Sequence, residues 1–307
     1  MRGWLAAAMM TFWSTTAAAE PPKPLVIYIA TAATTAQAPI LGALAEGWAK
    51  ERAAEIRTWK DLDDLRGVIL SGRGDVWIGH LDGFAQAARR GAPVTLVAVT
   101  AWSAKFRFLT LDPSPTDGAE LIADLATRGE ALGMVPQGSP AQGFVEDVPG
   151  LKLRPMPPQQ AGLELARGSI RHLLAPEPLA SALVAKFPEL HRAGSVADLA
   201  PGTRPGGLPM AGVAVRAGLL AEDPELVAGL AAGMRAWATR HADDPAAIAA
   251  ALPPETRAAI GEAVLAESLR HDPLLVVDAA DAKDEVRRAL RAVDGPHPLP
   301  DAFFAKP

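Results

Sequence analysis

Few side chains in this sequence have the spacing of a known catalytic or metal-binding motif. Its six histidines stand at positions 80, 172, 191, 241, 271 and 297. No two are three or four residues apart, the spacing by which a helix presents two zinc ligands. Cysteine is absent from the 307 residues, which excludes thiol nucleophiles, cysteine-bound metals and disulfides. We therefore expect a binding protein rather than an enzyme, with no catalytic residue, no metal and no cofactor.

Three threonines follow the first predicted strand. The apolar run Leu25–Ala30 is typical of a strand that is buried on both faces. Thr31, Thr34 and Thr35 stand between this run and a predicted helix. Ligands of α/β proteins bind outside the carboxyl ends of the strands, so we expect these threonines either to contact a ligand or to cap the helix.

His80, Asp82 and Phe84 occupy the equivalent position after a later predicted strand, Asp75–Gly79. The same topological reasoning makes them candidate ligand contacts. For Asp82 the alternative is an ordinary helix cap, because an aspartate near a helix N-terminus accepts free backbone N–H groups.

Trp102, Ser139 and Glu177 complete the candidate site. Trp102 follows the fourth predicted strand, where it would stack on a planar ligand or pack in the core. Ser139 opens a predicted helix and would contact the ligand, cap that helix, or both. Glu177 precedes another helix and would face the ligand or stabilise the helix N-terminus.

The elements that would carry these side chains alternate between strands and helices. Strands are predicted at 25–30, 54–59, 75–79, 94–101, 131–135, 151–156, 172–175 and 208–215. Helices are predicted at 39–51, 61–70, 82–90, 117–126, 161–167, 223–240, 245–252, 254–269 and 279–293, with one more opened by Ser139. The alternation implies an α/β fold with mainly parallel sheets. A proline-rich break at 112–115 suggests two lobes, which we expect at 20–104 plus 205–307 and at 105–204.

The first nineteen residues have the features of a cleavable export signal. Arg2 precedes the mostly apolar stretch Trp4–Trp13, and the small residues Ala17–Ala19 stand before Glu20. The apolar stretch is much shorter than the roughly 20 residues that span a bilayer. Without a cysteine at the cleavage point, lipid anchoring is excluded. We expect a monomer in the periplasm that is not inserted in the membrane.

The charge balance gives no support to nucleic-acid binding. The sequence has 30 basic and 35 acidic residues, a net charge of −5, and neither sign dominates a long block. Neutralising phosphates requires a basic face, so no nucleic-acid partner is expected.

The order of several motifs resembles the periplasmic solute-binding proteins of ABC importers, in the branch for nitrate, sulfonates, taurine and thiamine precursors. The motifs are Leu70–Gly79, Gly91 with Pro93–Ala98, Gly133–Ser139, Pro176–Pro178 and Asp223–Val227. The resemblance implies a type II periplasmic-binding fold. Its two lobes would close by a hinge on a small polar or anionic organic solute. The implied partner is an inner-membrane permease with its ATPase.

One segment departs from that family. The family usually has an aspartate after a glycine in the strand before the Glu-Pro pair, whereas Gly168 is followed here by Arg171 and His172 within four residues. These basic groups bring charge to a strand end, where they would contact the ligand or form a solvated edge.

Two alternative functions are compatible with the same fold. The first is an enzyme similar to thiamine-pyrimidine synthases, which use a bound cofactor and an active-site histidine, a role that only His80 would be placed to fill. The export signal argues against it. The second is a sensor that presents its closed form to a membrane receptor instead of a permease.

Overall fold

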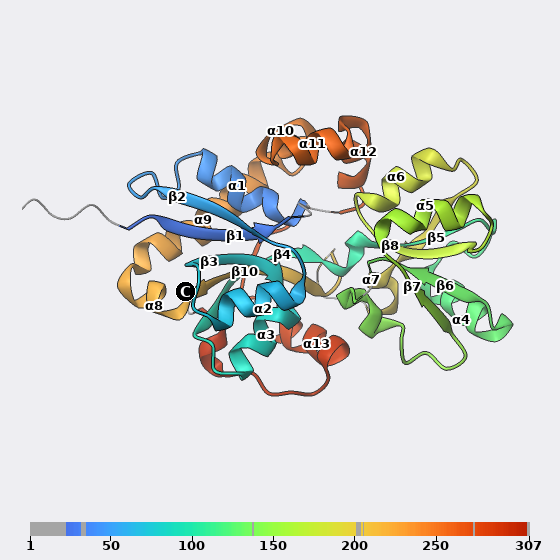
Figure 1. Ribbon diagram of the computed structural model, residues 1–307, viewed down its shortest axis with the longest axis horizontal. Helices are drawn as coiled ribbons and strands as arrows, with labels where there is room; N and C mark the ends of the chain where they lie inside the picture. The colour runs from blue at the N-terminus through green and yellow to red at the C-terminus, as the bar shows by residue number, and fades with distance from the viewer. Residues whose placement is uncertain are drawn as a thin grey trace, which may run out of the picture.

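The computed structural model describes residues 23–31, 35–136, 138–200, 204, 206–272 and 274–305. Its strands form two sheets, in the orders β11-β4-β10-β3-β1-β2 and β7-β6-β8-β5-β9. Figure 1 shows the two sheets in separate lobes, which we call lobe 1 (six strands) and lobe 2 (five strands). The predicted two-lobed α/β fold is therefore confirmed. The predicted export signal, residues 1–19, lies outside the described residues.

The lobe 1 sheet is built from the first four strands of the chain and two that join it later. These are β1 (Leu25–Ala30), β2 (Ala54–Trp59), β3 (Val76–His80), β4 (Val94–Trp102), β10 (Pro209–Arg216) and β11 (Val277–Asp278). β1 pairs in parallel with β2 and β3, whereas β10 lies antiparallel between β3 and β4. β10 is reversed because the chain re-enters lobe 1 at the edge where β3 and β4 end. The sheet is mixed, although the sequence predicted mainly parallel pairing.

Helices cover both faces of this sheet and enclose a hydrophobic core on each. One face is covered mainly by α1 (Ala38–Ala45), α9 (Pro224–His241) and α10 (Pro245–Ala251). The other is covered by α2 (Leu62–Leu70), α3 (Leu81–Arg89) and α13 (Lys283–Asp294). Asp61 and Asp223 cap α2 and α9 through their side chains, as expected for aspartate at a helix start.

Lobe 2 has the same layered construction. Its strands are β5 (Phe106–Thr110), β6 (Ala131–Met134), β7 (Lys152–Pro155), β8 (His172–Pro176) and β9 (His191–Ser195). β6 is parallel to β7 and β8, and β5 is antiparallel to β8 and β9. One face packs on α4 (Gly118–Arg128), α7 (Val196–Leu199) and the 3-10 helix η3 (Pro140–Phe144). The other packs on α5 (Pro158–Ala166) and α6 (Leu179–Lys186).

Short segments connect the two lobes. The 3-10 helix η2 (Ser103–Lys105) joins β4 directly to β5, and the chain returns between α7 and β10. After β10 come α8 (Ala217–Glu222), α9, α10, α11 (Pro254–Ile260), α12 (Glu262–Leu269) and α13. Of these, α12 packs on α6 and α13 packs on η3, so both touch lobe 2. The boundaries expected at 104/105 and 204/205 fall in these connections and stay predictions.

Several elements differ from their predicted form. The helix predicted at 39–51 ends at Ala45, because Gly47 and Ala49 take positive φ angles of 97° and 61°. The helix predicted at 254–269 is divided at Gly261, and the one opened by Ser139 is the short η3. The strands β5 and β9 were not predicted, because charged residues interrupt their apolar pattern. No helix in the described ranges is long and apolar enough to cross a membrane.

Replacing Gly42 by alanine should lower the free energy of unfolding by about 1–3 kcal/mol, because the added methyl group overpacks the core. Gly42 in α1 faces Trp237 of α9, which is 4% exposed, and a β-carbon at Gly42 would overlap the indole ring. Gly67→Ala is the matched control. Gly67 is exposed in α2 with nothing within 4 Å of the added carbon, so that change should stabilise by about 0.5–1 kcal/mol. Urea denaturation measures both, and equal effects would contradict the packing argument.

Candidate functional site

The carboxyl ends of β1, β2, β3 and β4 in lobe 1 face lobe 2. Because η2 connects β4 directly to β5, the start of β5 lies at the same boundary. β8 runs antiparallel to β5, and β6 runs parallel to β8, so the carboxyl ends of β6 and β8 reach this boundary from the other side. We call this region the lobe boundary (Figure 1). It is where α/β folds place their ligands.

A buried ion pair lies at the lobe boundary. Lys105 of η2 and Asp272, which follows α12, are 5% and 4% exposed, and Nζ of Lys105 lies 3.7 Å from Oδ2 of Asp272. The hydroxyl of Thr35, in the 3-10 helix η1 (Thr35–Gln37), donates to the same carboxylate oxygen. The pair therefore joins the first crossing, the C-terminal helices and the segment that follows β1.

His80 lies at the end of β3 beside this pair. Its ring meets the ring of Trp59 edge-on, with the centroids 6.2 Å apart. Burial lowers the pKa of His80; Asp82 acts in the opposite direction and Lys105 lowers the pKa further. The imidazole is therefore neutral near pH 7. Its Nδ1 is enclosed and has no hydrogen-bond partner among the described residues.

Asp82 and Gln37 also carry enclosed polar atoms. Asp82 lies in the first turn of α3, and His80 rather than Asp82 holds the N-cap position of that helix. Oδ1 of Asp82 and Oε1 of Gln37 have no partner among the described residues. Buried polar atoms are normally hydrogen-bonded, so unpaired atoms at the lobe boundary are what a solute would bind.

The predicted threonines are placed differently from one another. Thr31 is exposed, and its hydroxyl donates to the carbonyl of Trp59 at 3.0 Å. Thr35 binds Asp272, as described above. Thr34 lies outside the described residues.

Phe84 and Trp102 are fully buried in the hydrophobic core of lobe 1. Nε1 of Trp102 donates to the carbonyl of Leu275 at 2.9 Å. Trp102 thus takes the core position given above as the alternative to ligand contact, and Phe84 packs in the same core. Ligand contact by either stays a prediction.

Ser139 and Glu177 both act as local caps. Ser139 accepts the N–H of Ala141 at 3.3 Å at the start of η3. Glu177 is fully buried, and its carboxylate accepts from the backbone N and the hydroxyl of Ser181 at 3.0 and 2.7 Å. These are the capping and stabilising roles that the sequence analysis gave as alternatives to ligand contact. A further contact of either residue with a solute stays a prediction.

A second polar group lies where α12 meets lobe 2. Arg107 of β5 donates to the carbonyl of His271, and Nη1 of Arg192 on β9 lies 3.9 Å from Oε1 of Glu267. The same Glu267 oxygen is 3.1 Å from Nε2 of His271. Both guanidinium groups approach the C-terminal end of α12, where carbonyl dipoles favour positive charge. These contacts hold lobe 2 against the C-terminal helices.

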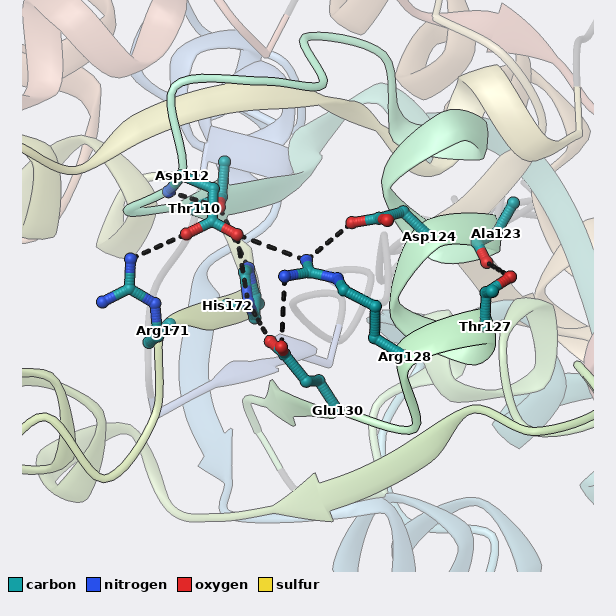
Figure 2. Close-up of polar contacts among 9 residues, drawn as sticks. All are labelled: Thr110, Asp112, Ala123, Asp124, Thr127, Arg128, Glu130, Arg171 and His172. Atoms are coloured by element: carbon teal, nitrogen blue, oxygen red, sulfur yellow. Dashed lines mark hydrogen bonds and ion pairs between the residues drawn. The ribbon is translucent and has the colours of Figure 1, made fainter.

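Arg171 and His172 lie at the opposite end of lobe 2 from the boundary. His172 is the first residue of β8, so it stands at the strand's amino end, which points away from lobe 1. Figure 2 shows both residues in an ion-pair network with Asp112, Arg128 and Glu130. The sequence left open whether they contact the ligand or form an edge of the sheet; the direction of β8 places them at the edge of lobe 2 that is distal to the boundary.

The distal network is a structural one. His172 is 1% exposed, with Nδ1 2.9 Å from the hydroxyl of Thr110 and Nε2 3.1 Å from Oε2 of Glu130. The hydroxyl of Thr110 also accepts the N–H of Asp112 at 3.0 Å. Both ring nitrogens are therefore engaged within lobe 2.

We expect His172→Ala to lower the free energy of unfolding by about 1–3 kcal/mol, since it removes the ring nitrogen that contacts the buried hydroxyl of Thr110. Arg171→Ala, at an exposed pair, should change it by less than about 1 kcal/mol. Neither change should alter solute affinity. Urea denaturation and ligand titration of both variants test this, and a large loss of affinity in Arg171→Ala would place that residue in the site after all.

Sequence reasoning missed Gln37, Lys105 and Asp272. Lys105 gave a weak signal, because it is a single charge between the apolar ends of two strands. Gln37 and Asp272 gave none, because their neighbours in sequence are unremarkable for a loop or helix start.

The fold defined by these lobes is that of the type II periplasmic solute-binding proteins. The structure of an ABC transporter protein from Parabacteroides distasonis superimposes with a TM-score of 0.70 at 14% identity, covering 94% of this chain and 99% of that one. The periplasmic aliphatic sulphonate-binding protein SsuA of Escherichia coli gives 0.69 at 14% identity, with 93% of each chain covered. The periplasmic nitrate-binding protein NrtA of Synechocystis gives 0.59 at 13% identity, with 88% and 80% covered.

At these identities the comparison establishes the fold and not the solute. No family model matches the sequence, and no curated protein matches it.

Proposed function

We propose that this protein is the periplasmic solute-binding component of an ABC importer. It captures a small polar solute at the lobe boundary and delivers it to an inner-membrane permease and its ATPase. The observation that carries the proposal is the set of enclosed, unpaired polar atoms on His80, Asp82 and Gln37, at the strand ends where this fold places ligands. The similarity to sulphonate- and nitrate-binding proteins supports the same function.

Two sets of polar contacts at the lobe boundary provide a mechanism for this function. Lys105 and Asp272 tie the first crossing to the C-terminal helices, and Arg107 and Arg192 tie lobe 2 to α12. A solute bound between the lobes would add contacts to both and favour the closed arrangement. The permease would then recognise the closed form.

Thermal unfolding in the presence of solutes tests the proposal. A ligand at 100 times its Kd adds about 2.7 kcal/mol to stability, which should raise Tm by roughly 4–5 °C for a chain of this size. We expect such a shift from at least one compound in pools of amines, pyrimidines, sulfonates and nitrate. Mass spectrometry of the gently purified protein should identify the same compound. If no metabolite pool changes Tm and nothing co-purifies, the solute-binding function fails.

The periplasmic location has its own test. We expect export to remove residues 1–19, so N-terminal sequencing of the protein from a periplasmic extract should begin at Glu20. Retention of Met1 in an expressed and folded protein would contradict the location, without bearing on solute binding.

A further inference from the structure

Gln37 presents an unpaired acceptor at the end of β1. It is 2% exposed, and its Nε2 donates to the carbonyl of Ala30 at 3.3 Å. Because a carbonyl only accepts, this bond assigns the orientation of the amide and leaves Oε1 as the free atom. Oε1 is enclosed without a partner among the described residues. Such an atom is a strong site for a ligand N–H.

Asp82 and His80, at the end of the neighbouring strand β3, add two more enclosed acceptor atoms to the one on Gln37. Asp82 is 9% exposed and its enclosed Oδ1 is unpaired; an ionised carboxylate only accepts hydrogen bonds. His80, with its pKa lowered by burial, is neutral and can accept at the unpaired Nδ1. β1 and β3 are paired in the sheet, so all three residues lie at or after the ends of adjacent strands.

No described residue forms an ion pair with Asp82, and the two cations whose charges act on Asp82 and His80 each have another partner. Lys105 is paired with Asp272. The charge of Asp82 raises the pKa of Arg89 against the larger, opposite effect of burial. Arg89 is itself paired with Asp294. Enclosed Nε atoms of Arg107 and Arg192 also lack partners among the described residues. Arg192 is paired with Glu177 and Glu267, and Arg107 donates to the carbonyl of His271. A buried carboxylate without a cation is costly.

We infer that the solute carries N–H donors and positive charge, as a small amine, amidine or related organic cation, and that Gln37, Asp82 and His80 bind that end of it. The inference rests on the proposed solute-binding function and specifies its substrate class. Nitrate and alkanesulfonates present only acceptors, so their oxygens would meet the unpaired acceptors of Gln37 and Asp82. A site built for an N–H donor rejects an analogue without it by large factors.

Calorimetric titration with donor and acceptor probes, of which benzamidine and benzoate are matched in shape, tests the inference on the full mature protein. The donor set is benzamidine, ethylamine and 4-aminopyrimidine; the acceptor set is benzoate, ethanesulfonate and nitrate. We expect a donor compound to bind at least about 100-fold more tightly than its acceptor counterpart. Asp82→Asn and Gln37→Leu should each weaken that binding by about 10- to 100-fold. Asp63→Asn, an exposed acidic residue in the first turn of α2, is the matched control and should bind as the wild type does.

The outcomes distinguish a failure of the inferred substrate class from a failure of the proposed solute-binding function. If nitrate or a sulfonate binds and the donor set does not, the substrate class is wrong while solute binding stands. If donors bind equally well to wild type, Asp82→Asn and Gln37→Leu, the assigned residues are wrong. If neither set nor any metabolite pool binds, the proposed function itself fails. Circular dichroism and the unliganded Tm of each variant distinguish lost affinity from lost folding.

Discussion

Lys105→Met should lower the free energy of unfolding by about 3–5 kcal/mol, because it leaves the carboxylate of Asp272 buried without a cation. The two side chains are 7% and 6% exposed, so water cannot replace the missing partner. Asp272→Leu should lower the free energy of unfolding by a similar amount, because it leaves the ammonium group of Lys105 buried without an anion. Urea denaturation of the purified variants gives the change in midpoint and slope.

The double variant Lys105→Met/Asp272→Leu gives the decisive comparison. Replacing both members of a buried pair by apolar side chains is often close to neutral, so the double variant should be much less destabilised than the sum of the single ones. Lys60→Met, at an exposed lysine, is the control and should change stability by less than about 0.5 kcal/mol. Strictly additive single effects would mean that Lys105 and Asp272 do not interact.

Acidification below about pH 6.5, the pKa of an unperturbed histidine, should destabilise the protein through two histidines at the lobe boundary. Burial lowers the pKa of His80, and Lys105 lowers it further. Burial also lowers the pKa of His271; Glu267 opposes this, while Arg192 and Arg107 act with it. Each histidine therefore binds its proton less readily in the folded chain than in the unfolded chain.

The sign of the effect follows from that difference. Above about pH 6.5 both states are neutral at these sites and the stability is full. Below it the unfolded chain takes up protons first, so stability falls until the pH passes the lowered pKa of the folded state. The slope has a ceiling of about 1.4 kcal/mol per pH unit for each histidine, and His271, whose side chain is 27% exposed, should contribute less.

Urea denaturation between pH 7.5 and 5.5 measures the effect. His80→Gln and His271→Gln should each reduce the loss of stability over this range, and His297→Gln, at an exposed position, should leave it unchanged. Wild-type pH dependence in both boundary variants would mean that other groups titrate there.

Features that depend on neighbouring residues could be predicted from the sequence. Apolar runs identified β1, β3, β4 and β10 to within two residues, because a buried strand needs a continuous apolar segment. Asp117, the first residue of the helix predicted at 117–126, caps α4, since a cap bonds backbone groups two or three residues away. The order of these elements was enough to indicate two lobes.

Features that join distant parts of the chain needed the tertiary structure. Asp272 meets Lys105 only because α12 ends at the first crossing, and nothing near either residue in sequence specifies that contact. The place of His172 likewise depends on the direction of β8, which is antiparallel to β5. A one-dimensional pattern shows that a strand exists but not which end of it faces the other lobe. The sequence by itself thus determined the elements and the two-lobed fold; sheet order and strand direction decided which side chains reach the lobe boundary.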